Sequence, residues 1–127
     1  ISFPGLGGDG TTAAQTLFTF NARFGERYSI QAKLSAWTAR YTCSAGVNVW
    51  IENSSGTVVP IRGFDQFSFG VSDCNNAVGG EKICLGYFAP ENTDEFTVRC
   101  NYSVGGYNNY QNQGSNSGGV QAMIYKL

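Results

Sequence analysis

The sequence contains no histidine, and this absence removes the commonest catalytic and metal-binding devices. Without histidine, neither a Ser-His-Asp nor a Cys-His arrangement can be built. The four cysteines include no C-x-x-C pair, so the short ligand spacings of the usual zinc sites are also absent. The nine carboxylates fall mostly in expected turns or on polar strand faces, where a solvated carboxylate is the default. We therefore expect that the protein is not an enzyme.

Charge is scarce as well, because only 13% of the residues are charged and the net charge is −1. No stripe of basic residues is present to neutralise a phosphate backbone, so we expect no nucleic-acid partner. No apolar run approaches the roughly 20 residues that a membrane-spanning helix needs, so we expect no membrane span. Hydrophobic residues make up 42% of the 127 residues, which suits one domain with its own core.

Amphipathic helices of useful length are absent too, and a two-residue alternation of apolar and polar side chains recurs instead. The clearest alternating segments are residues 28–36, 47–52, 95–102 and 120–125, and weaker ones are 16–22, 57–61, 65–71 and 81–89. Turn-forming residues separate them at 23–27, 53–56, 78–80, 90–94 and 105–119. This spacing predicts an all-β fold: one antiparallel β-sandwich of about eight strands with jelly-roll-like connections, over residues 15–127.

The first 14 residues differ from the rest, because they are rich in glycine and carry only the apolar side chains Ile1, Phe3 and Leu6 at their start. One interpretation is a flexible terminus. The other is a partner-binding segment that adds to the sheet edge of a neighbouring copy, which would make the protein a homo-oligomer.

Four cysteines in a short chain predict two disulfides and an oxidising, extracellular location, with four reduced thiols as the alternative. A bridge from Cys84 to Cys100 would flank the 90–94 turn. It conflicts with the alternation, because assigning Ile83, Leu85 and Tyr87 to the core turns Cys84 outward, while Cys100 shares a face with core residues. We therefore predict the pairs Cys74–Cys84 and Cys43–Cys100.

A calcium ion is the one cofactor for which the sequence offers ligands, since carboxylate, amide and backbone oxygens suffice for it. Asp73, Asn75 and Glu81 form the candidate set. Ordinary polar turn residues are the alternative interpretation.

Several aromatic residues fall where a core residue is not expected. Trp37 and Trp50 lie on the polar faces of alternating segments, and the loop tyrosines stand beside amides. A flat aromatic ring with amide partners suits a sugar ring, and it also suits a protein interface. The predicted glycan contact set is Trp37, Tyr41, Tyr107, Asn108, Asn109 and Tyr110. Packing under a loop, or a solvated linker, is the alternative.

Three segments resemble small bacterial galactophilic lectins: VNVWIENSSGTVVP (47–60), GYFAPENTDEFTVRCNYSVGGYNNY (86–110) and GGVQAMI (118–124). The resemblance implies a β-sandwich and calcium-dependent galactose binding. Asn109 matches the calcium loop of that family, but Tyr102 stands at its aspartate position and Gly106 at its threonine position. The chain is also similar to bacterial pre-peptidase C-terminal domains.

We predict an extracellular carbohydrate-binding or adhesive module that recognises a glycan or another cell-surface partner. The alternative is a structural subunit of an extracellular filament, or the tip domain of a viral or phage fibre, held by β contacts between subunits. A third hypothesis is an accessory domain of a protease or toxin.

Overall fold

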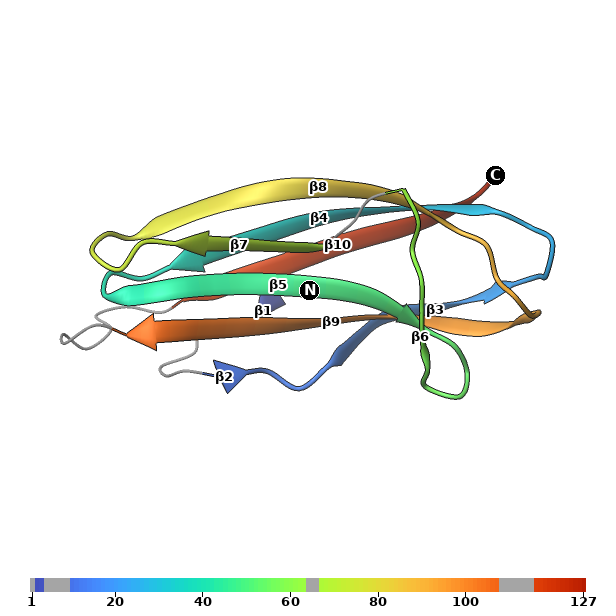
Figure 1. Cartoon of the computed structure of the whole chain (residues 1–127), viewed down its shortest axis with the longest axis horizontal. Coiled ribbons are helices and arrows are strands. Elements are labelled where there is room, and N and C mark those ends of the chain that lie inside the picture. The colour runs from blue at the N-terminus through green and yellow to red at the C-terminus, as the bar shows by residue number, and fades with distance from the viewer. Residues whose placement is uncertain (1, 4–9, 64–66, 108–115) are drawn as a thin grey trace.

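Two antiparallel sheets packed face to face make up the computed structural model, which describes residues 2–3, 10–63, 67–107 and 116–127 (Figure 1). Sheet A has the strand order β1 (Ser2–Phe3), β10 (Ser117–Lys126), β4 (Tyr28–Thr38) and β8 (Val78–Phe88). The predicted all-β antiparallel sandwich is confirmed. The described residues contain no helix, and hence none long and apolar enough to cross a membrane.

Sheet B is built around two long central strands, β9 (Asp94–Tyr107) and β5 (Thr42–Glu52). The outer edge of β9 pairs with β2 (Gly10–Thr11) and β3 (Gln15–Ala22), and the outer edge of β5 pairs with β6 (Val58–Val59) and β7 (Ser68–Ser72). Except from β5 to β6 and β7, each step between successive long strands changes sheet. This alternation gives the jelly-roll-like connections that the sequence predicts.

The core lies between the sheets and follows the predicted alternation in four strands. In β4, β5 and β9 every second side chain is buried, and in β10 Val120 is buried while Met123 and Tyr125 are exposed. At one end of the sandwich, aromatic rings from three strands interlock around Phe88, which lies 4.8 Å from Phe96 and 5.7 Å from Phe20 between ring centroids. These contacts between strands far apart in the chain hold the two sheets together.

Strand β8 has the opposite phase from the prediction. Cys84 and Phe88 face the core, whereas Ile83, Leu85 and Tyr87 face outward. The cause is its register with β4: Cys84 pairs with Ala32, which is buried, and directly paired residues share a face. Between the two core residues Gly86 also points inward, and there Ile61 and Phe67 fill the space that a side chain would take.

Two predicted turns overlap strands. β9 runs to Tyr107 and β10 begins at Ser117, so both ends of the turn predicted at 105–119 lie in strands. Residues 78–80 form the start of β8 rather than a turn, because they pair with residues 36–38 of β4. Trp37 lies against Gly79 and Phe69 against Gly80. A tight turn that was not predicted joins β4 to β5 at residues 39–41, where Tyr41 has a φ of 71° and the Thr42 amide donates to the Ala39 carbonyl at 3.2 Å.

The disulfide joins Cys43 to Cys74, so both predicted pairings are wrong. Strand β7 pairs with the beginning of β5, with Ser72 opposite Ser44, and this register brings Cys74 next to Cys43. Cys84 and Cys100 are instead buried thiols in sheets A and B, and burial raises the pKa of both. One disulfide is thus confirmed, and such bonds persist in oxidising compartments outside the cytosol.

The described parts of the N-terminal segment pair with the chain's own sheets. Ser2 and Phe3 pair with Gly119 and Gly118 of β10, and Gly10–Thr11 pairs with β9. A role of this segment in a partner's sheet stays a prediction.

Candidate functional site

Three of the predicted glycan contacts, Trp37, Tyr41 and Tyr107, lie at the end of the sandwich where β4 and β9 end and β5 begins, the end that carries the disulfide (Figure 1). Trp37 lies on the outer face of sheet A, 39% exposed, with its ring over Gly79 of the neighbouring strand. Tyr41 lies in the adjacent turn under the Arg40 guanidinium, 4.7 Å from ring centroid to charge centre. The backbone of Tyr107 ends β9 opposite Thr42. Asn108, Asn109 and Tyr110 lie outside the described residues.

A shallow groove surrounds Trp37 on sheet A. The polar groups in its lining include Ser35, Glu81 and Ser117, and four glycines complete its floor. The exposed ring beside a carboxylate and hydroxyls is an arrangement that could stack on a sugar and bond its hydroxyls.

The candidate calcium ligands have other partners. The Asp73 carboxylate accepts hydrogen bonds from the Asn75 amide at 2.9 Å and the Asn76 amide at 3.3 Å, which hold the pKa of Asp73 below its usual value. Glu81 lies along β8, where its carboxylate is 3.3 Å from the Lys33 ammonium. No group of three or more Asp, Glu, Cys or His residues clusters in the described chain. A calcium site at these residues stays a prediction.

The outer face of sheet A carries exposed apolar side chains in two columns, which the sequence interpretation missed. One column lies on β8 and the other on β10, and we call them together the apolar face: Ile83, Leu85, Tyr87, Met123 and Tyr125. Ile83 is 71% exposed and the other four are about half exposed. Apolar residues on both sides of β8 are a sequence signal for a strand with two covered faces.

Between these columns runs the polar column of β4. Met123 and Leu85 flank Gln31 on either side, and Tyr125 and Tyr87 flank Ser29 in the same way. The next row places Lys33 between Gln121 and Ile83. The surface therefore has an apolar–polar–apolar stripe pattern across the sheet.

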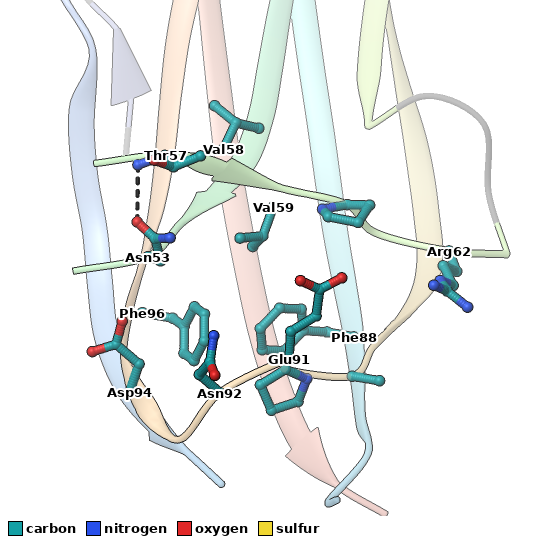
Figure 2. Close-up of a pocket in the computed structure, with 13 residues that line it drawn as sticks. Asn53, Thr57, Val58, Val59, Arg62, Phe88, Glu91, Asn92, Asp94 and Phe96 are labelled. Atoms are coloured by element: carbon teal, nitrogen blue, oxygen red, sulfur yellow. Dashed lines mark hydrogen bonds between the residues drawn. The ribbon is translucent and has the colours of Figure 1, made fainter. Parts of the chain in front are cut away.

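A pocket opens at the other end of the sandwich (Figure 2). A segment that we call the strap, residues 53–62, crosses this end above Phe88 and Phe96. Asp94 fastens one end of the strap by accepting bonds from the Ser54 hydroxyl at 2.7 Å and the Ser54 amide at 3.2 Å. These bonds hold the pKa of Asp94 below its usual value. Arg62 fastens the other end through paired backbone bonds to Tyr87 of 2.8 and 2.6 Å.

The cavity between the strap and the loop at residues 89–93 has a volume of about 220 Å³. Phe88 and Phe96 are buried at its floor, and Val59 points toward them from the strap in Figure 2. The charged and amide side chains in its lining, Glu91, Arg62 and Asn92 among them, come from the strap, the loop and the start of β9. The pocket combines an apolar interior with polar groups, a pattern typical of binding sites.

No family model matches the chain, and no curated protein matches it. Among solved structures, the VP2 subviral particle of infectious bursal disease virus aligns with 98% of this chain at 15% identity and a TM-score of 0.44. The Gx strain of the same virus aligns with 98% of the chain at 17% identity and a TM-score of 0.44. The chain spans only 28% and 29% of the lengths of these two proteins. At these scores the likeness carries no argument about function.

Proposed function

We propose that this domain is a secreted, non-catalytic structural subunit that assembles with further copies of itself through the apolar face of sheet A. The observation that carries the proposal is the exposure of Ile83, Leu85, Tyr87, Met123 and Tyr125 on one sheet face. The disulfide between Cys43 and Cys74 supports the extracellular location.

The size of the apolar face supports a protein contact. Two half-exposed tyrosines and three exposed aliphatic side chains present on the order of 500 Å² of surface, which is at the upper end for patches on monomers. A standard interface takes about 800 Å² from each partner. The apolar face and the polar column of β4 together approach that area.

The stripe pattern supports a second copy as the partner. Suppose that the sheet A faces of two molecules pack against each other about a two-fold axis that lies in the interface. Each apolar column of one molecule then meets an apolar column of the other. The polar column of β4 then meets its own copy, so Gln31 faces an amide rather than an apolar side chain. Lys33 brings its own counter-charge, since Glu81 is 3.3 Å away. The surface is thus complementary to itself.

The test is the particle mass of the whole chain, measured by light scattering after size exclusion, for the variant Leu85→Glu. A charge in one of the two apolar columns of a packed face should weaken association by about 100-fold or more. Thr19→Glu is the matched control, because Thr19 is also exposed but lies on β3 of sheet B, outside the pocket. The proposal fails if the Leu85→Glu protein has the same mass as the unaltered chain across the concentration series.

Glycan binding at the Trp37 groove is the second candidate function, and the position of the ring over Gly79 beside Glu81 favours it. Trp37→Ala should remove binding on a glycan array, whereas Trp50→Ala on the opposite outer face should not. If the unaltered chain binds no glycan, or if Trp37→Ala binds as before, this candidate is wrong.

A further inference from the structure

Phe24 is a prominent apolar projection that neither the core nor the apolar face uses. It lies in the turn between β3 and β4 and is 70% exposed. Its backbone is well held, because its amide donates to the Thr93 hydroxyl at 2.9 Å and the Glu26 amide donates to the Arg23 carbonyl at 3.1 Å. A large aromatic ring held in water on a bonded turn is unfavourable in an isolated molecule and typical of a contact residue.

The pocket under the strap lies beside this turn. Thr93, whose hydroxyl accepts the hydrogen bond from the Phe24 amide, belongs to the loop that forms one side of the pocket. Its two sequence neighbours, Asn92 and Asp94, both line the pocket. The cavity of about 220 Å³ is smaller than the 300–1,000 Å³ that is usual for small-molecule sites. It is of the size for one large side chain, and its Phe88 and Phe96 rings suit an aromatic guest.

The exposed arginines beside the projection and the exposed glutamates of the loop beside the pocket are opposite in charge; Arg62 also lines the pocket, and Glu26 of the turn is paired with Lys126. Arg23 and Arg27 flank Phe24 and are exposed, while Glu91 and Glu95 are exposed in and beside the loop that walls the pocket. The salt bridges within the described residues use other side chains. These four charges are therefore available to a second molecule.

We propose that the pocket under the strap binds the Phe24 side chain of a second copy of this chain. Because projection and pocket lie side by side at the same end, two copies that meet end to end about a two-fold axis exchange their Phe24 rings. The arginines of each turn then face the acidic groups beside the partner's pocket. This contact is separate from the apolar face, and a subunit with both contacts can form an extended assembly.

The experiment measures self-association of the whole chain by sedimentation velocity from about 1 μM to about 1 mM. All variants carry Leu85→Glu, so that the contact through the apolar face is absent. Phe24→Ala should weaken the remaining association by about 30-fold, the effect of losing a central aromatic contact. Ala89→Trp, which fills the pocket mouth from an exposed position, should weaken it equally. Leu127→Ala is the control, because Leu127 is exposed and bonded to Arg27 next to the same turn.

Charge reversal provides the second measurement. Arg27→Glu and Glu91→Arg should each weaken association by about 5-fold, and the double variant should restore it. A Leu85→Glu protein that is monomeric at every concentration would overturn the proposal, as would a Phe24→Ala loss that Ala89→Trp does not reproduce. Failure of the apolar-face proposal gives a different result: the Leu85→Glu protein then has the same particle mass as the unaltered chain.

Discussion

The two outer faces of the sandwich present opposite chemistry on the same backbone architecture. On sheet B the outward side chains bond to one another: Trp50 donates to Glu52 at 2.6 Å, and Asn48 donates to Asn101 at 2.9 Å. Arg99 lies 3.6 Å from the Glu52 carboxylate and donates to the Thr16 hydroxyl at 2.6 Å. On sheet A the outward side chains include Ile83, Leu85, Tyr87, Met123 and Tyr125, all exposed.

The difference teaches where each face obtains its stability. Bonds within the chain engage the Asn48, Asn101, Trp50 and Glu52 side chains of sheet B, so most of that face needs only water beyond it. The apolar groups of sheet A gain free energy only when something covers them. Substitutions on sheet B should therefore lower the stability of the fold, and substitutions on sheet A should lower association.

The largest effect on folding should come from removing the disulfide that connects the two sheets. The Cys43–Cys74 disulfide joins β5 of sheet B to the loop that enters β8 of sheet A, with a separation of 31 residues. Replacing both cysteines by serine should lower the free energy of unfolding by about 3 kcal/mol, because the unfolded chain gains freedom. Urea unfolding under non-reducing conditions measures this loss, and an unchanged midpoint would contradict it.

One ion pair on each outer face allows the stability of the two faces to be compared: Arg99–Glu52 on sheet B and Lys33–Glu81 on sheet A. Arg99→Ala should lower the free energy of unfolding by about 1–3 kcal/mol, since the half-buried Glu52 carboxylate loses its counter-charge. Lys33→Ala on sheet A should cost less than about 1 kcal/mol, because the Lys33–Glu81 pair is solvated. Equal losses in thermal or urea unfolding would mean that the two faces do not differ in internal stability.

A third change tests the comparison by giving the outer face of sheet B an apolar surface like that of sheet A. Asn48 and Asn101 form one cross-strand pair, and replacing both with valine removes donor and acceptor together. The free energy of unfolding should stay within about 1 kcal/mol of the original value. The new apolar surface should raise the particle mass even in the Leu85→Glu background. A particle mass no higher than that of the Leu85→Glu protein itself would show that apolar surface alone does not drive association.

The smallest effect concerns acid pH at the strap. The pKa of Asp94 lies below its usual value, mainly because the Ser54 hydroxyl donates to it. A depressed carboxylate pKa adds stability above the pKa of the unfolded chain, near 3.8, and this stability is lost as pH falls through the lower folded value. Asp94→Asn should therefore flatten the loss of stability below about pH 4, which urea unfolding at a series of pH values measures. Identical pH profiles would assign the acid loss to other groups.

The accuracy of the sequence interpretation depends on how many faces of a strand are apolar. In β4, β5, β9 and β10 one face is clearly the more apolar, so the alternation alone identifies the buried side chains. In β8 both faces are apolar, so the alternation does not show which of the two faces is buried. Only pairing with Ala32 selects the phase that buries Cys84, and this choice exposes Leu85 and creates the apolar face.

Sequence alone determined the fold class, the outward position of Trp37 and the scarcity of catalytic groups, because alternation and composition are local properties. The tertiary structure decided the disulfide partners, the phase of β8, the strap pocket and its neighbour Phe24. Each of these depends on which strands lie side by side, and strand pairing joins residues whose separation the local pattern does not encode.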